Sequence, residues 1–135
     1  KAIIYNYALG SENEEKELFT PIFSGGSSFI NSTKIGYNSE GSKIYGKWPQ
    51  GTKKQLVKVK KLDEFNFNEI DFIKIDVQGY EYEVLKGAKK TLEINSPIIC
   101  LEEEYPENSR TIKFLESFNY EIIDVILKEH IFKKK

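Results

Sequence analysis

The chain has 135 residues, a length that favours one globular domain, and 39% of them are hydrophobic. Twenty basic and 21 acidic residues leave a net charge of −1, which excludes the strong basic field that draws proteins to nucleic acids or anionic membranes. One cysteine and one histidine exclude a disulfide framework and a Cys- or His-rich metal site. We therefore expect a cytoplasmic protein with no metal, no nucleic acid and no membrane as partner.

The first half of the chain alternates short strand patterns with glycine-rich sequence. Ala2 to Ala8 and Glu17 to Phe23 have the composition of strands. Residues 24–54 are rich in Gly, Ser and Asn with little periodicity, which predicts an irregular insert. Gln55 to Lys60 then alternates apolar and polar residues, the period of a half-exposed strand, and Leu62 to Phe65 forms a short polar turn.

The second half reads as alternating strands and helices. Asp71 to Val77 is almost continuously apolar, as a strand covered on both faces requires. An amphipathic helix follows Gly79, because apolar residues recur there at helical spacing: Tyr80, Val84, Leu85, Ala88 and Leu92. The remaining expected elements are a strand, a helix and two strands: Pro97–Glu102, Asn108–Phe118, Glu121–Leu127 and His130–Phe132. This order predicts one α/β domain over residues 1–135, with a mostly parallel sheet and an antiparallel C-terminal strand pair.

The lone cysteine and histidine receive structural interpretations. Cys100 lies in an apolar run and is expected to be a buried thiol. His130 has no partner in the sequence for nucleophilic or metal chemistry, and we expect it at an exposed strand position.

Acidic residues follow two successive strands of the predicted sheet. Asp76 closes a strand just before a glycine turn, a position where ligands bind in open α/β sheets, and capping of the following helix is an equal alternative. Glu102 to Glu104 end the next strand, about 4.8 Å away if the strands are neighbours. One of these glutamates and Asp76 could orient a hydroxyl, act as a base or hold a hard cation; three solvated charges are the other interpretation.

The segment Ile73–Ala88 carries the most specific pattern in the chain: I-K-I-D-V-Q-G-Y-E, followed by V-L-K-G-A after two residues. This segment resembles the hallmark of the FkbM-type methyltransferases. Weaker similarity to the same family extends to other parts of the chain: Asn6, Ala8–Gly10, Gly26–Ser28, Val57–Phe65 and Ile98–Glu102.

The resemblance implies a Rossmann-like class I methyltransferase that transfers the methyl group of S-adenosylmethionine to a hydroxyl, on a sugar, another glycan or a small metabolite. It implies three groups of site residues. Those expected to bind the cofactor are Asn6, Ala8, Leu9, Asp76 and Gly79. Those expected to position the reacting hydroxyl or take its proton are Asp76 and Glu102. Those expected to contact the acceptor are Glu81, Ser27 and Ser28.

Two departures from the family pattern qualify the expected activity. Gln78 stands where the family usually has Glu, which removes one charge. The first strand, the glycine-rich cofactor loop and the ribose-binding acid of the fold would precede Lys1, so we expect the N-terminal part of the fold to be missing. The alternative function is a non-catalytic α/β module that serves as a binding or assembly surface.

Overall fold

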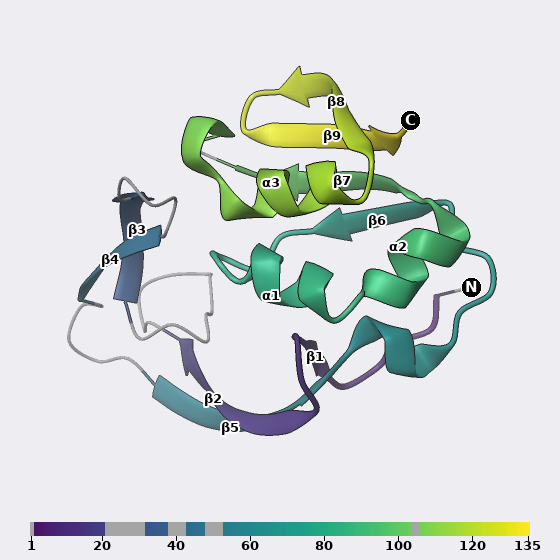
Figure 1. The fold of residues 1–135 in the computed structure, drawn as a ribbon. Coiled ribbons are helices and arrows are strands. Elements are labelled where there is room, and N and C mark those ends of the chain that lie inside the picture. Colours follow the sequence, from purple (N-terminus) through teal and green to yellow (C-terminus); the bar gives the residue numbers. More distant parts are fainter. Residues whose placement is uncertain (1, 21–31, 38–42, 48–52, 104–105) are drawn as a thin grey trace.

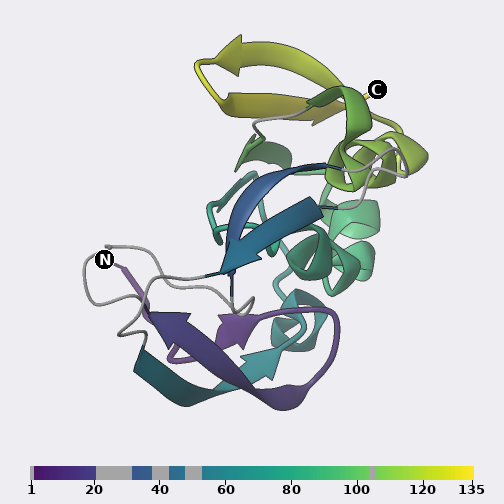
Figure 2. The same ribbon diagram turned by 90° about the vertical axis from the view of Figure 1, so that its left-hand side faces the viewer.

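The computed structural model describes residues 2–20, 32–37, 43–47, 53–103 and 106–135. For residues 32–37 and 43–47 it describes the backbone only. Within these ranges the strands form two larger sheets and one hairpin, and three α-helices lie against one face of the larger of the two sheets (Figure 1). In the turned view, β1, β5 and β2 lie at the bottom and β8 and β9 at the top (Figure 2).

The larger sheet contains four strands in the order β6-β7-β9-β8. Their bounds are β6 Phe72–Ile75, β7 Ile98–Glu102, β9 Glu129–Lys134 and β8 Tyr120–Ile126. Strands β6 and β7 are parallel, whereas β9 runs antiparallel to both β7 and β8. The expected antiparallel C-terminal pair is therefore confirmed, and β6 with β7 is the parallel pair of this sheet.

Three helices cover one face of this sheet: α1 Glu81–Lys86, α2 Lys89–Asn95 and α3 Arg110–Ser117. The predicted helical stripe is confirmed, since all five of its residues are buried in the core. Alternate positions of the strands supply the other side of the core, among them Ile75, Ile99, Leu101 and Phe132. Burying each such side chain contributes about 1.5 to 3 kcal/mol, so this layer stabilises most of the domain.

The opposite face of β6 and β7 is not covered by any described element. Phe72 is 55% exposed and its neighbour Ile98 is 37% exposed. The prediction that Asp71–Val77 is covered on both faces is therefore wrong for the described part of the chain. The strand is also shorter than predicted, because β6 pairs with β7 only over Phe72–Ile75.

The second sheet has the order β1-β5-β2. Its strands are β1 Ala8–Leu9, β5 Lys53–Lys60 and β2 Glu14–Thr20, and a 3₁₀ turn, Leu62–Phe65, follows β5 as predicted. The strand expected at Ala2–Ala8 is wrong except at its end, because Ala2–Tyr7 pairs with no described strand. The strand expected at Glu17–Phe23 begins three residues earlier, because its charged residues pair along β5 in spite of their composition.

A hairpin of β3 (Ser32–Tyr37) and β4 (Lys43–Lys47) lies in the segment expected to be an irregular insert. The other residues of 24–52 lie outside the described ranges, so the irregular insert as a whole stays a prediction. The mostly parallel sheet is also wrong: of six strand pairings within the described ranges, two are parallel and four antiparallel.

The helix predicted after Gly79 is divided between α1 and α2 at Gly87 and Ala88. Backbone from the second sheet packs against this break: a Cβ on Gly87 would lie 2.0 Å from the carbonyl oxygen of Gly10. The N–H of Asp63 donates to the carbonyl of Gly87 at 3.0 Å, and the Asp63 carboxylate accepts from the N–H groups of Lys90 and Thr91 at the start of α2. The break therefore joins the helix layer to the second sheet.

Strand β8 lies at the edge of the larger sheet and is exposed after its buried first residue, Tyr120. Ile122, Ile123, Val125 and Ile126 are 42 to 56% exposed, and a bulge interrupts the register between Ile122 and Asp124. The Asp124 carboxylate accepts the N–H of Val125 at 2.8 Å.

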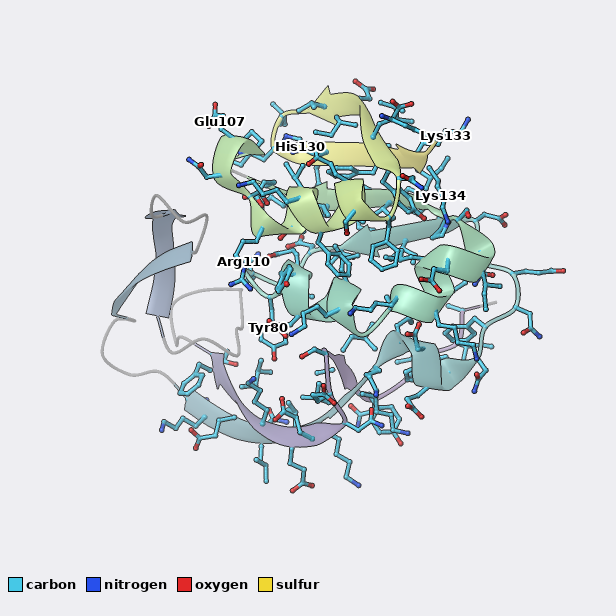
Figure 3. The ribbon with its side chains drawn as sticks, viewed as in Figure 1. Tyr80, Glu107, Arg110, His130, Lys133 and Lys134 are labelled. Atoms are coloured by element: carbon cyan, nitrogen blue, oxygen red, sulfur yellow. The ribbon has the colours of Figure 1, made fainter. Side chains whose placement is uncertain are left out.

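The lone histidine and cysteine are both buried. His130 is 5% exposed and its Nδ1 lies 3.1 Å from the carbonyl oxygen of Lys128, so the expected exposed position is wrong. It belongs to the inner strand β9, whose helix-facing positions lie under α3. Figure 3 labels it by β9. The expected burial of Cys100 is confirmed. None of the described helices is both long and apolar enough to cross a membrane.

Replacing Gly87 by Ala is expected to lower the free energy of unfolding by about 3 kcal/mol, because the added methyl group meets backbone that cannot rotate away. This clash exceeds the gain of about 1 kcal/mol that Ala brings to a helix over Gly. Urea unfolding measures the difference. Lys89→Ala, at an exposed position two residues away, is the control and should change stability by less than about 0.5 kcal/mol. A Gly87→Ala variant as stable as wild type would contradict the close approach.

Replacing Tyr120 by Phe is expected to stabilise the protein, and more so at high pH. The Tyr120 hydroxyl is buried without a hydrogen-bond partner among the described residues, and burial raises its pKa from 10.0 to about 12. Tyr120 ionises more easily in the unfolded state than in the folded state, so the folded protein loses stability as the pH rises from about 10 to 12. Urea unfolding at pH 7 and pH 11 should show a gain of about 1 kcal/mol for Tyr120→Phe at pH 7 and a larger gain at pH 11. An equal difference at both pH values would contradict the raised pKa.

Candidate active site

A tight turn follows β6 and carries Asp76. Gln78 has φ 52° and Gly79 has φ 99°, so two successive residues lie at positive φ, and the N–H of Tyr80 closes the turn onto the carbonyl of Val77 at 3.3 Å. Gln78 Nε2 donates to Asp76 Oδ1 at 3.1 Å. The backbone therefore holds the Asp76 carboxylate at the carboxyl end of the strand.

Glu81 stabilises the same turn through its buried side chain. Its side chain is 3% exposed and its Oε1 accepts the N–H of Gly79 at 2.9 Å. Residue Tyr80 is the N-cap of α1 and gives no side-chain cap, and Asp76 accepts no N–H of the helix in the described contacts. The capping alternative for Asp76 is therefore wrong, since Glu81 makes the carboxylate contact at this helix start.

A cavity of about 920 Å³ lies beside this turn. Its walls come from β1, from β6 and from the start of α1, and include Leu9, Ile73, Asp76, Val77 and Tyr80. The lining is mainly apolar with few polar groups, the usual character of a small-molecule site, and its volume lies in the range of such sites.

The structure brings together some of the residues that the sequence singled out. Ala8, Leu9 and Asp76 line the one cavity although β1 and β6 are more than 60 positions apart in the chain. Asn6 is exposed and does not line it, and Gly79 and Glu81 support the turn behind it. Ser27 and Ser28 lie outside the described residues.

Glu102 lies at the end of β7 and is half-buried. The parallel register pairs Ile75 with Leu101, so Asp76 and Glu102 are the next positions on neighbouring strands and follow the same side of the sheet. Glu102 does not line the cavity. The two carboxylates are thus neighbours in register, with Asp76 at the cavity wall.

The next glutamate has a structural role. Glu103 is 2% exposed, accepts from the hydroxyl of Ser109, and donates its N–H to the carbonyl of Lys128 at 2.9 Å. Ser109 in turn caps α3 by accepting the N–H of Ile112. The interpretation of Glu102–Glu104 as three solvated charges is therefore wrong at Glu103, and Glu104 lies outside the described residues.

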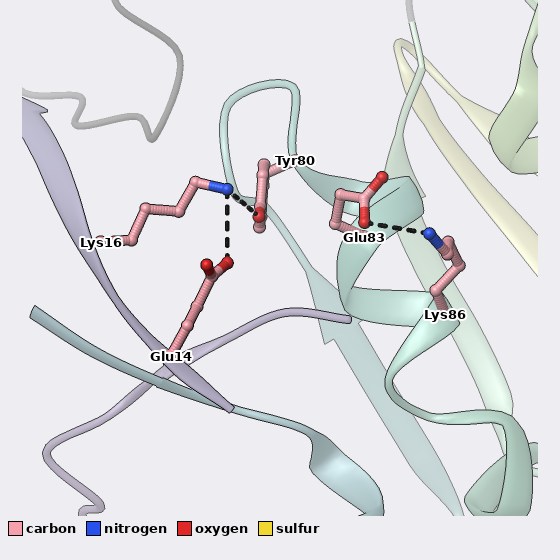
Figure 4. A network of polar contacts seen from close by, with 5 residues as sticks. All are labelled: Glu14, Lys16, Tyr80, Glu83 and Lys86. Carbon is pink, nitrogen blue, oxygen red and sulfur yellow. Dashed lines mark hydrogen bonds and ion pairs between the residues drawn. The ribbon is translucent and has the colours of Figure 1, made fainter. Parts of the chain in front are cut away.

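Tyr80 connects the cavity wall to the second sheet. Its hydroxyl accepts a hydrogen bond of 2.8 Å from Lys16 Nζ on β2, and the ammonium lies 5.0 Å from the ring centroid. Glu14 Oε1 is 3.5 Å from the same ammonium (Figure 4). The hydrogen bond to Tyr80 raises the pKa of Lys16 above its usual value, in spite of partial burial, so Lys16 is charged at neutral pH.

A second polar cluster lies on the uncovered face of the larger sheet. Glu129 pairs with Lys74 and accepts from the thiol of Cys100 at 3.2 Å. The hydrogen bond from Lys74 lowers the pKa of Glu129, while burial raises the pKa of Cys100. This thiol is therefore held protonated and is a poor nucleophile.

A family model described as the methyltransferase FkbM domain matches residues 1–122 of the chain. The chain belongs to the FkbM methyltransferase family. Searches of curated proteins and of solved structures gave no match. Membership confirms the resemblance carried by Ile73–Ala88, and it favours a methyltransferase over a non-catalytic module.

No group of three His, Cys, Asp or Glu side chains within the described ranges of the FkbM domain could hold a metal ion. The hard-cation interpretation of Asp76 and Glu102 therefore has no third ligand there. Sequence reasoning missed Lys16, because a charged residue on an alternating strand gives no sign of a contact 64 positions away. It also missed the buried roles of Glu81 and Glu103, since acidic residues near helix starts are common on surfaces.

Replacing Gly79 by Ala in the FkbM domain is expected to cost about 1 to 3 kcal/mol of stability, because a φ of 99° is outside the region that L-residues adopt. The substitution should disturb mainly the turn that holds Asp76. Thermal unfolding measures the cost, and Ala88→Ser, at a buried position of negative φ between α1 and α2, separates a packing loss from backbone strain. A Gly79→Ala variant with wild-type stability would show that the turn adopts another conformation.

Proposed function

We propose that this FkbM domain is an O-methyltransferase that uses S-adenosylmethionine as donor and a hydroxyl of a sugar, glycan or small metabolite as acceptor. The observation that carries the proposal is the common cavity of Ala8, Leu9 and Asp76, which are three of the five positions that the family pattern assigns to the cofactor. Family membership supports methyl transfer, and the donor and acceptor are the proposed part.

The residues present fit a ligand of this chemistry. The apolar walls at Leu9, Ile73 and Val77 suit the flat adenosine moiety, and the carboxylate of Asp76 suits its amino or hydroxyl donors. The bound donor would supply a methyl group on a positively charged sulfur.

The protein's own part in the reaction is to position the acceptor and to take a proton. The acceptor oxygen attacks the methyl carbon, the carbon–sulfur bond breaks, and its electron pair stays on sulfur. The hydroxyl proton passes to a carboxylate, for which Asp76 is our first assignment because it lines the cavity. Glu102, next in register, is assigned to orient the hydroxyl.

Titration calorimetry with S-adenosylhomocysteine tests the donor. We expect measurable binding by wild type and about tenfold weaker binding by Asp76→Asn, which loses a charged hydrogen-bond acceptor. Asp71→Asn is the matched control, because this exposed carboxylate lies at the opposite end of β6, outside the cavity lining, and should leave affinity unchanged. Absence of binding by wild type at millimolar ligand would contradict the proposal.

A further inference from the structure

We propose that Lys16 is a positioning residue for the active site: through the hydroxyl of Tyr80 it holds the Asp76–Tyr80 turn in the cavity wall. The choice of S-adenosylhomocysteine as the ligand in the test rests on the proposed function. Lys16 is on β2 and Tyr80 is the N-cap of α1, so the bond joins the second sheet to the helix layer on the side where Asp76 lies.

The first step is the placement of Tyr80. It is 7% exposed, lines the cavity, and points from the start of α1 toward the second sheet (Figure 3). Its N–H closes the turn onto Val77, so its backbone and its hydroxyl are fixed at the same time by different partners. A movement of the ring would therefore move the turn.

The second step is the strength of the contact from Lys16. The ammonium donates to the hydroxyl at 2.8 Å and lies 5.0 Å from the centroid of the ring, beyond its hydroxyl edge. A hydrogen bond from a charged donor is stronger than a neutral one. Glu14 lies 3.5 Å from the same ammonium.

The third step is the place of this contact in the fold. The second sheet meets the helix layer closely at Gly10 and Gly87, where backbone contacts backbone. Gly10 also adjoins the Tyr80 ring, since a Cβ there would lie 3.4 Å from Tyr80 Cε1. The hydrogen bond from Lys16 to Tyr80 joins β2 to the turn that carries Asp76, beside this close approach.

Four variants and a control test the inference by titration calorimetry with S-adenosylhomocysteine. Lys16→Ala and Tyr80→Phe should each weaken binding by about tenfold. The double variant should bind as tightly as either single variant, because both substitutions remove the same hydrogen bond. Lys16→Arg keeps a charged donor and should recover most of the affinity. Lys54→Ala is the control: Lys54 makes the same kinds of contact, to Glu17 at 3.3 Å and to the Phe19 ring at 5.3 Å, away from the turn.

A merely structural role predicts a different pattern. Both variants would then have lower melting temperatures with wild-type affinity per folded molecule, and the effects of the two substitutions would match that of Lys54→Ala. Affinities equal to wild type in Lys16→Ala and Tyr80→Phe would overturn the inference, provided that wild type binds the ligand.

Hydrogen exchange tests the inference without ligand. The amides of Gly79 and Glu81 should exchange at least about threefold faster in Lys16→Ala and Tyr80→Phe, while amides of β7 remain unchanged. If wild type binds no S-adenosylhomocysteine, the proposed donor is wrong and this measurement alone decides: faster exchange confined to the turn supports the role of Lys16. Unchanged exchange at the turn overturns it.

Discussion

The contact between Gly10 and Gly87 is the constraint on which the rest of the structure depends. Backbone of the second sheet reaches backbone at the end of α1 there, at a distance that leaves no room for a side chain. The contact ends α1, and the Asp63 carboxylate then starts α2 immediately afterwards. Because α1 also begins at the Asp76 turn, one close approach fixes the helix layer, the turn and the second sheet relative to one another.

Much of the larger sheet could be predicted from the sequence, because its signals are local. The apolar stripe from Tyr80 to Leu92 and the strands Ile98–Glu102 and Glu129–Lys134 follow from periodicity, which depends on the residues themselves. The N-terminal half could not be predicted as well. Strand β2 is charged and exists because it pairs with β5, and the expected strand at Ala2–Ala8 has almost no partner.

The candidate site was predicted in part for the same reason. Asp76 was singled out by its position at the end of a strand, which is a local feature, and Ala8 and Leu9 by a family pattern. Glu81 and Lys16 depend on contacts that the sequence does not reveal. A buried carboxylate that accepts a turn amide looks like any acidic residue of a first helical turn, and Lys16 reaches Tyr80 only after two sheets have packed together.

The side chain of Asp124 has a consequence for the open edge of the larger sheet. An edge strand with four exposed branched residues offers backbone donors and acceptors to a further strand. On β8 the Asp124 carboxylate accepts the Val125 N–H, and the adjacent bulge disturbs the spacing that a further strand would need. The one charged residue among these branched side chains thus makes the edge a poorer template for strand pairing.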